Sequence, residues 1–373
     1  MAEFVVTASA PSTLTLDLGS EPRTGRLAVV IYNPVAGSGP GKVRVELEAV
    51  RERFAAAGWR CGGIATQQAG DGTEAARLAL ASGADMVVAM GGDGTINEVV
   101  QALAGQSVPL GIIPTGTINI LALELGLPME PMAAVDALAR GTPRTIDLGR
   151  ANGRFFTIMI GIGYDAQATL NLLPELKAWT GPLAYWVAAF RSYTHHKAVR
   201  AKLLISDGRR TRRLRRLVYI TVISNSGLYA GGRLQFYGDA PQPQAPWIFR
   251  QLRRLVGLGS ESYSAVRELV PLAAGGTPDR APPPPADVAD GVLDAVVIRS
   301  GRWYRALFHG LLTFLGKLHT VGDVEFFRAT RIEFHASRPI PYQLDGDHAG
   351  QSPVVVEIVP QALRVVVPSP GEG

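Results

Sequence analysis

The fold of this 373-residue chain is decided by the stretch Gly91-Gly92-Asp93-Gly94-Thr95-Ile96-Asn97-Glu98. An apolar run, Met86–Met90, precedes it, and an amphipathic run, Val99–Leu103, follows it. This order predicts a buried strand, a tight glycine turn and the N-terminus of a helix. Because glycine has no Cβ, such a turn can approach a bulky anion at φ values that other residues avoid. The helix start then favours phosphate through its N–H groups and dipole, so the stretch predicts a nucleotide-phosphate site.

The first half of the chain alternates strand-like and helix-like segments. Apolar strand runs lie at Leu27–Tyr32, Met86–Met90 and Leu110–Ile113, with helical spacing between them. Strands that alternate with helices at this spacing predict a parallel, doubly wound sheet over residues 26–148. Ligands of such sheets bind outside the carboxyl ends of the strands. We therefore expect the loops 33–41, 91–98 and 114–119 to converge on one crevice.

The pattern changes after residue 148. Strand-like runs, several with period-two alternation, predict an antiparallel, β-rich second domain over residues 149–365. They include Leu217–Ser224 and Val324–Phe334, and Asp207-Gly208 is a hairpin turn signal between two of them. Within it, residues 238–286 are rich in proline, which sustains neither a helix nor a central strand, so we interpret them as an insertion. Residues 1–25 and 366–373 are expected to be loose tails. Whether the final segment of the second domain returns to the first domain stays open.

Composition narrows the class of protein. Apolar residues make up 47% of the chain and charged residues 18%, as in a globular protein with two cores. No apolar run reaches the roughly 18 to 20 residues of a membrane span, and the first 26 residues lack a basic signal-peptide region. The single cysteine, Cys61, fits a reducing compartment. We expect a cytoplasmic protein.

Six arginines fall within eight residues, 209–216, although the formal net charge is only +5. On a strand they would alternate between the two faces. A solvated edge that resists edge-to-edge pairing and an anionic membrane surface are both compatible with the cluster. Nucleic acid is disfavoured, because no recognisable nucleic-acid module accompanies these residues.

Further motifs make the prediction from the glycine turn more specific. The first loop carries Asn33-Pro34 and Gly37, the loop after the fourth strand reads Pro114-Thr115-Gly116-Thr117-Ile118-Asn119, and the second half contains Asp287-Val288-Ala289-Asp290-Gly291 and Leu344-Asp345-Gly346-Asp347. In this order, the set resembles the soluble lipid kinases that include bacterial diacylglycerol kinase and the sphingosine kinases. The resemblance covers roughly residues 26–365, apart from the insertion. It implies an NAD kinase-like or diacylglycerol kinase-like α/β domain, a β-sandwich domain and an active site in the cleft between them.

The resemblance also implies roles for particular residues. Nucleotide contacts would come from Asn33, Gly37, Thr66, Gly91, Gly92, Asp93, Gly94, Thr95, Asn97, Glu98 and Thr117. Asp93 would lie beside the phosphates and Mg²⁺. The Asp345-Gly346-Asp347 stretch matches the family's catalytic motif, and either of its acids, or Asp93, could accept the proton of the acceptor hydroxyl. The carboxylates of Asp287 and Asp290 and the carbonyl of Val292 match a structural Mg²⁺ site in some members.

Two departures from the family pattern are visible. Asp347 stands where glutamate is more common, and Leu123 stands where an arginine is common. Each motif also has a plainer interpretation: Asp287 and Asp290 could flank a turn, Glu98 could be a helix-surface charge, and Asp345-Gly346-Asp347 could be an ordinary turn.

The motifs, through the resemblance that they carry, thus imply an ATP-dependent, Mg²⁺-requiring kinase that phosphorylates a hydroxyl of a membrane lipid, such as diacylglycerol or a sphingoid base. Such an enzyme would contact the membrane peripherally. An NAD kinase, which uses a similar glycine turn, and a degenerate member that binds lipid or nucleotide without turnover are the alternatives. A homodimer and the identity of the lipid stay open.

Overall fold

The computed structural model describes residues 14–19, 25–34, 45–116, 119–170, 197–227, 286–299 and 318–369, together with Arg305, His309 and Leu312. Packing divides the chain into two units, and each is described by itself. Unit 1 comprises Met1–Thr117, Pro128–Pro143 and Val365–Gly373. Unit 2 comprises Ile118–Leu127 and Arg144–Arg364. Nearly all of the 238–286 insertion lies outside the described residues, as do Gly37 and Thr117.

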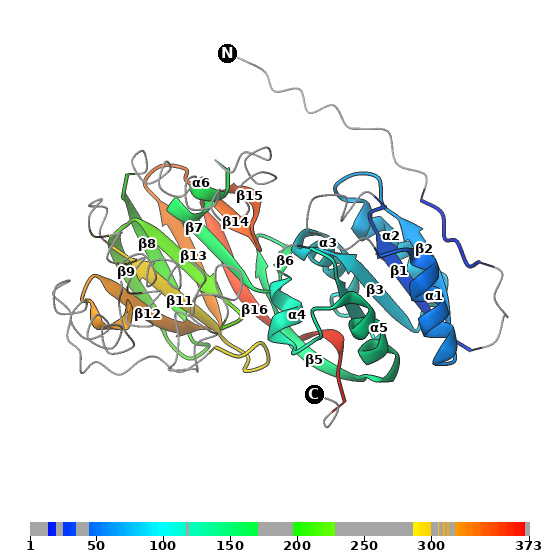
Figure 1. Ribbon diagram of the computed structural model, residues 1–373. Coiled ribbons are helices and arrows are strands. Elements are labelled where there is room, and N and C mark those ends of the chain that lie inside the picture. The colour runs from blue at the N-terminus through cyan, green and yellow to red at the C-terminus, as the bar shows by residue number, and fades with distance from the viewer. Residues whose placement is uncertain are drawn as a thin grey trace, which may run out of the picture. The chain divides into compact units, whose positions relative to one another are not determined.

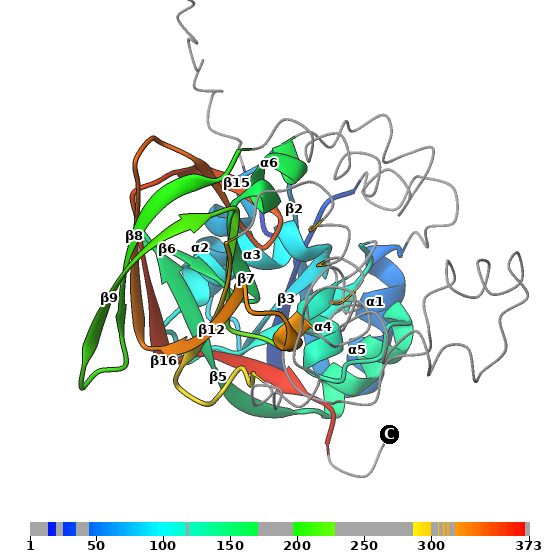
Figure 2. The ribbon, with the colours of Figure 1, turned by 90° about the vertical axis from the view of Figure 1, so that its left-hand side faces the viewer.

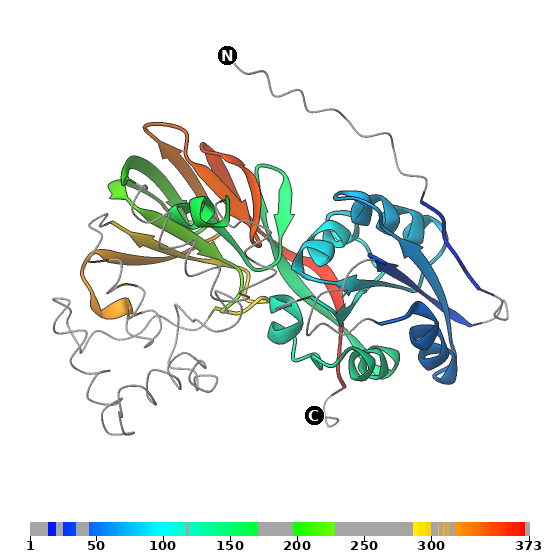
Figure 3. The same ribbon diagram turned by 45° about the horizontal axis from the view of Figure 1, so that its top comes forward.

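Unit 1 is a parallel sheet covered by helices. Its strands are β1 (Arg26–Tyr32), β2 (Trp59–Ala65), β3 (Met86–Gly91) and β4 (Leu110–Pro114). Its helices are α1 (Leu47–Ala56), α2 (Asp71–Ala81), α3 (Asp93–Leu103) and α5 (Pro131–Arg140). All three strand pairings, β1 with β2, β1 with β3 and β3 with β4, are parallel. Helices α2 and α3 pack together on one face, and α1 and α5 pack together on the other (Figures 1 and 3).

The apolar character of β3 follows from this double cover. Every residue of Met86–Gly91 is buried, because helices exclude water from both faces of the strand. A strand with one solvated face would instead alternate apolar and polar residues. The continuous apolar runs on which the prediction of a doubly wound sheet rested therefore have a direct structural cause.

The strand order of unit 1 is β2-β1-β3-β4. From β1 the chain moves to β2 on one side, and then crosses back to place β3 on the other side. The order therefore reverses between β1 and β3, which makes this point the topological switch of the sheet. In open α/β sheets, ligands bind at the carboxyl ends of the strands beside such a switch.

Part of the N-terminal stretch is more ordered than expected. We expected a loose tail over residues 1–25, but Asp17 forms an antiparallel bridge with Gly63 of β2. The buried Arg51 of α1 donates to the Asp17 carbonyl and pairs with its carboxylate at 2.8 Å. For residues 14–19 the expectation of a loose tail is therefore wrong, because a buried guanidinium fixes this segment to the edge of the sheet.

Unit 2 is built mainly from strands. They are β5 (Thr142–Ala151), β6 (Arg154–Phe156), β7 (Met159–Gly163), β8 (Val199–Ser206), β9 (Thr211–Val218), β10 (Ile220–Ser224), β11 (Leu293–Ile298), β12 (Val324–Ala329), β13 (Arg331–Ala336), β14 (Pro341–Leu344), β15 (Asp347–Gln351) and β16 (Val354–Val367). Short helices lie at α4 (Ile120–Glu124), α6 (Tyr164–Leu170) and η1 (Leu318–Thr320).

Two antiparallel sheets of unit 2 share one core. One runs β16-β13-β8-β9, with β5 paired to β16 and β6 paired to β5, and the other runs β12-β11-β10-β7-β14-β15 (Figures 2 and 3). Alternate residues of β8 and β13 point inward, and they meet inward residues of β7, β10 and β11 in a single apolar cluster. The structure thus confirms the expected fold class, an α/β domain with a parallel sheet followed by an antiparallel β-sandwich domain.

Two expected strands prove to be four. The run Val324–Phe334 is split at Thr330 into β12 and β13, which belong to different sheets. The run Leu217–Ser224 is split at Tyr219 in the same way, between β9 and β10. Neither run contains the glycine or proline that would mark a turn, and inward residues of both sheets contribute to the same core. Hydropathy alone therefore does not reveal where a strand changes sheets.

Strand β16 contributes to both units. Its residues up to Arg364 belong to unit 2, where β13 pairs with it antiparallel. Val365 belongs to unit 1 and pairs in parallel with Leu110 of β4. The chain therefore returns to the first unit at its C-terminal strand.

Candidate functional site

The carboxyl ends of four parallel strands lie at one edge of unit 1. Asn33 follows β1, Thr66 follows β2, Gly92 follows β3 and Thr115 follows β4. The registers pair Tyr32 with both Ala65 and Met90, and Gly91 with Pro114, so the four ends are level with one another. The candidate nucleotide residues from these loops are therefore brought to the same edge, beside the switch point between β1 and β3.

The glycine turn is compact for a different reason than the sequence suggested. Gly91, Gly92 and Gly94 are absent from the residues with positive φ, so the expectation of unusual φ values in this turn is wrong. Glycine is needed at Gly91 because a Cβ there would lie 2.5 Å from the Thr95 hydroxyl. The Gly91 carbonyl also accepts hydrogen bonds from the N–H groups of Thr115 and Gly116, at 3.1 and 3.2 Å. Close packing of the end of β3 against Thr95 in the first turn of α3, and not φ, selects glycine at Gly91.

Helix α3 starts earlier than the sequence indicated. Gly92 is its N-cap, in extended conformation, and Asp93 is its first residue. Residues 93–97 therefore form the first turns of the helix, whereas the sequence placed them in the turn before it. A glycine N-cap has no side chain to satisfy the first N–H groups of the helix, which have no intrahelical acceptor. The N-terminus of α3 is thus an anion-accepting end at the carboxyl end of β3.

Glu98 has a structural partner within unit 1. Its two carboxylate oxygens accept hydrogen bonds from the N–H groups of Gly70 and Gly72, at 2.8 and 2.9 Å. Its carbonyl accepts from the Thr73 hydroxyl. These contacts place a negative charge at the N-terminus of α2, which carries no side-chain cap of its own. The structure therefore gives Glu98 a helix-capping role, and its nucleotide contact stays a prediction.

Two further candidates of the first unit also make local contacts. The hydroxyl of Thr66 donates to the Tyr32 carbonyl at 3.3 Å, and its N–H donates to the same oxygen at 2.8 Å. Asn97 is buried on α3, and its carbonyl accepts from the Gln101 amide. Thr66 thus joins the ends of β1 and β2 at the candidate edge.

In unit 2, Asp345 is surrounded by donors. One of its carboxylate oxygens accepts from the N–H and hydroxyl of Thr157, and the other accepts from the N–H groups of Ile158 and Met159, all at 2.7 to 3.0 Å. An ionised carboxylate has about four lone-pair positions, so these donors occupy it fully. Asp345 also adopts a φ of 49° in the turn between β14 and β15. Its carboxylate ties that turn to the start of β7.

Asp347 differs from Asp345 in its surroundings. It is the first residue of β15, and its side chain is exposed. The two acids of the motif are therefore unlike: Asp345 is fixed by backbone N–H groups, and Asp347 faces solvent. The contacts of Asp345 thus give it a structural role in this turn, and the catalytic role of the motif stays a prediction.

Asp287 and Asp290 flank a turn before β11. One oxygen of Asp287 accepts from the Ala289 N–H, and one oxygen of Asp290 accepts from the Val292 N–H. The other oxygen of Asp290 pairs with Arg328. Within the described part of the chain, no three histidine, cysteine or carboxylate side chains converge as metal ligands. A structural Mg²⁺ site at Asp287, Asp290 and Val292 therefore stays a prediction, and it would require Arg328 to release Asp290.

The structure draws attention to two acids that the sequence analysis did not single out, the partly buried Glu124 and the buried Asp294. Burial raises the pKa of Glu124, against the effect of a hydrogen bond from the Ser226 hydroxyl. Burial likewise raises the pKa of Asp294 to about 7, although Arg328 opposes the shift. Asp294 interrupts an otherwise apolar strand, and this interruption is the signal by which the sequence could have identified it.

Comparison with known proteins indicates the class of protein that this chain resembles. Residues 27–151 match the family model described as "Diacylglycerol kinase catalytic domain", and residues 279–367 match the model described as "YegS C-terminal NAD kinase beta sandwich-like domain". The resemblance to diacylglycerol kinases that the motifs indicated is thereby confirmed. Two segments of this chain are therefore similar to the two domains that these models describe.

Individual relatives agree with this class. A diacylglycerol kinase of Staphylococcus epidermidis is 36% identical over 182 residues, which is 48% of this chain and 57% of the relative. A diacylglycerol kinase of Bacillus subtilis is 40% identical over 163 residues, 43% of this chain and 53% of the relative. These matches span about half the length of the curated relatives. A solved diacylglycerol kinase structure from Bacillus anthracis shares the fold, with a TM-score of 0.60 at 18% identity over 94% of this chain and 99% of that one.

Among the described residues, no helix is both long and apolar enough to cross a bilayer.

Proposed function

We propose that this protein is an ATP-dependent lipid kinase that transfers the γ-phosphoryl group to the hydroxyl of a lipid such as diacylglycerol or a sphingoid base, with Mg²⁺. One observation carries the proposal. The N-terminus of α3 lies at the carboxyl end of β3, beside the switch point of the sheet, within residues 27–151 that match the catalytic-domain model.

At the nucleotide end, the backbone does most of the binding. The first N–H groups of α3 and the positive end of its dipole favour the phosphates of ATP. Gly92 allows close approach, because a Cβ there would meet only the Gly116 Cα, at 3.4 Å. Asp93, in the first turn of α3, is the residue that would hold Mg²⁺, which neutralises phosphate charge during phosphoryl transfer.

At the acceptor end, the lipid hydroxyl oxygen forms a bond to the γ-phosphorus while the bond to the bridging oxygen of ADP breaks. The hydroxyl proton must pass to a nearby base late in this step. We assign that role to Asp347, with Asp93 as the competing base. Of the two acids of the motif, Asp345 is the less suitable base, because four donors already occupy its carboxylate.

A lipid acceptor requires the enzyme to meet a membrane surface. We propose that it does so peripherally, from the cytoplasm, because its acceptor is a bilayer component. The 34–40% identity to diacylglycerol kinases over roughly half of their length supports a lipid acceptor.

The test is phosphate transfer from labelled ATP with Mg²⁺ to a panel of acceptors in mixed micelles. The panel contains diacylglycerol, monoacylglycerol, sphingosine, ceramide and NAD. Asp93→Asn and Asp347→Asn are the test variants. Glu74→Gln is the matched control, because it removes an exposed carboxylate from the surface of α2.

We expect one lipid to be labelled by the wild type and by Glu74→Gln, and labelling to fall at least about a hundredfold in both test variants, since each loses a group that acts in the transition state. Transfer to NAD alone would replace the proposal with an NAD kinase. ATP binding without transfer to any member of the panel would favour a degenerate binding protein.

A further inference from the structure

The outer face of the β8–β9 hairpin is strongly basic. On β8 the residues alternate, and Arg200 and Lys202 point outward from the sandwich core. The antiparallel register places Arg215 opposite Lys202 and Leu217 opposite Arg200. Directly opposed residues share a face, so these side chains and Arg213 lie on the same side of the sheet. We define Arg200, Lys202, Arg213 and Arg215 as the basic face. Arg213 and Arg215 lie on β9, which is the edge strand of its sheet (Figure 2).

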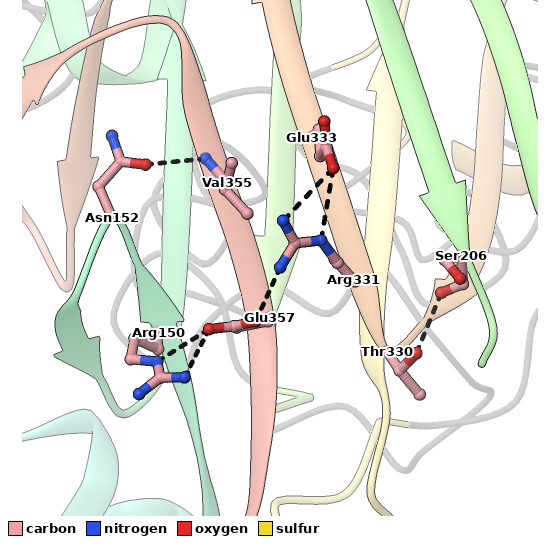
Figure 4. A network of polar contacts seen from close by, with 8 residues as sticks. All are labelled: Arg150, Asn152, Ser206, Thr330, Arg331, Glu333, Val355 and Glu357. Carbon is pink, nitrogen blue, oxygen red and sulfur yellow. Dashed lines mark hydrogen bonds and ion pairs between the residues drawn. The ribbon is translucent and has the colours of Figure 1, made fainter.

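No acid neutralises this basic face within the described part of the chain. The side chains of its four residues form no hydrogen bond or ion pair there. The other end of the same outer sheet surface is different (Figure 4). There, Glu357 of β16 accepts from both Arg150 and Arg331, and Arg331 also pairs with Glu333. Arginines at that end have carboxylate partners, whereas those of the basic face have none.

The inward arginines of β9 are also engaged. Arg216 pairs with Glu325 of β12 at 3.1 Å, and Arg212 lies over the ring of Phe327 at 5.9 Å. The alternation of β9 thus separates two groups of arginines. One group supports the fold through contacts with β12, and the other group, Arg213 and Arg215, faces solvent.

Folding does not account for the basic face. Like charges directly opposite each other on neighbouring strands are destabilising, and Arg215 is opposite Lys202. Protection of an exposed sheet edge needs charges on the edge strand, but it does not need a second basic row on β8. Leu217, 51% exposed, adds an apolar side chain beside these charges. The combination indicates a surface that is completed by an external anionic partner.

We propose that the basic face is the site at which this protein docks onto an anionic lipid bilayer. An outward sheet surface with several cations and an exposed leucine suits the interface of a leaflet with anionic head groups. Nucleic acid fits less well. Single strands are usually bound by aromatic stacking, and neither β8 nor β9 contains an aromatic residue. Duplex readers commonly insert a helix or ribbon into a groove, and the basic face is instead the broad side of a sheet.

This inference deepens the proposed function by naming the surface that meets the membrane. It can fail separately, because its test measures binding and not phosphate transfer. The full chain is sedimented with vesicles of phosphatidylcholine alone, or with about 30 mol% phosphatidylserine to mimic an anionic leaflet. The test variant is Arg213→Gln with Arg215→Gln. The rescue variant replaces both arginines with lysine.

The matched control is Arg53→Gln with Arg77→Gln. It removes the same charge from exposed positions on α1 and α2 of unit 1. Thermal unfolding of every variant shows whether it is folded. If the test variant unfolds at a lower temperature than the wild type, the single change Arg215→Gln replaces it. This change relieves a like-charge pair and leaves Arg213 in place.

We expect the wild type to bind only the anionic vesicles and to lose binding as salt rises, because screening weakens exposed charges. The glutamine pair is expected to bind at least about tenfold more weakly, since each basic residue near such a leaflet contributes about fivefold. The lysine pair and the control are expected to stay within about threefold of wild type, because lysine keeps the charge. Equal vesicle binding by the glutamine pair would overturn the proposal. So would equal losses in the control, or salt-sensitive binding to RNA or DNA in place of vesicles.

Discussion

At the scale of single residues, the two acids of the Asp345-Gly346-Asp347 turn have different environments and different expected roles. Asp345 accepts four hydrogen bonds, three of them from backbone N–H groups at the start of β7. Asp347 is exposed on β15. A motif that is uniform in sequence therefore combines an anchor for the turn with an acid that remains accessible to a substrate.

We predict that Asp345→Asn lowers the free energy of unfolding by about 3 kcal/mol, because the amide cannot accept from all four donors and buried N–H groups lose their partner. Urea unfolding measures the change. Asp347→Asn is the matched comparison and is expected to change stability by less than about 0.5 kcal/mol while it lowers phosphate transfer at least about a hundredfold. If the two variants unfold alike and only Asp345→Asn loses activity, the assignment of the base is reversed.

Asp294 provides a pH-dependent prediction. Burial raises its pKa from 3.8 to about 7 in the folded protein. Between these values the folded state holds a proton that the unfolded state has released, so stability falls as the pH rises through this window. Asp294→Asn cannot ionise, and it retains an oxygen that can face Arg328. We expect its unfolding free energy to fall less than that of the wild type between pH 4 and 7, which unfolding series at several pH values measure. Identical slopes would show that Asp294 does not titrate in this range.

At the scale of elements, Glu98 links α3 to α2. The charge of Glu98 lies where the first N–H groups of α2 need an acceptor, and the residue before α2, Gly70, offers no side-chain cap. Sequence alone could not find this contact, because the two partners are separated by more than twenty residues and by strand β3.

We predict that Glu98→Gln destabilises the protein by about 1 to 2 kcal/mol, because glutamine keeps one acceptor oxygen and loses the negative charge at the helix N-terminus. Thermal unfolding and ATP titration separate the two roles of Glu98. Glu74→Gln, on the exposed surface of α2, is the control and is expected to have little effect. Weaker ATP binding by Glu98→Gln, without loss of stability, would restore the nucleotide role implied by the resemblance.

At the scale of the whole molecule, the parts that could be predicted are those governed by local patterns. The strands of unit 1 could be predicted because burial on both faces produces continuous apolar runs. The Asp207-Gly208 turn between β8 and β9 could be predicted because such a turn needs a positive φ, which Gly208 adopts. The arginine-rich strand was expected to alternate between faces, and it does.

The parts that could not be predicted depend on long-range pairing. The change of sheet at Thr330 depends on which strands become neighbours. The return of β16 to unit 1 depends on the same choice, and the sequence therefore left it open. The anchoring of Asp345 by Thr157 joins residues that are far apart in the chain. The start of α3 at Asp93 was misplaced because three glycines favour a turn over a helix, and tertiary packing overrides that propensity.

The central claim is that ATP phosphates bind at the N-terminus of α3. Gly92→Ala tests it most directly, because Gly92 has φ −99° and ψ −173°, which alanine also adopts, and the added Cβ would meet only the Gly116 Cα. Gly322→Ala is the matched control, since a Cβ at Gly322 meets no atom within 4 Å.

The measurement is calorimetric titration of each folded variant with ATP and Mg²⁺. We predict that Gly92→Ala stays within about 1 kcal/mol of wild-type stability and binds ATP at least about tenfold more weakly, because the methyl group keeps the phosphates from the helix N-terminus. Gly322→Ala should bind as the wild type does. Wild-type ATP affinity in a fully folded Gly92→Ala would contradict the claim.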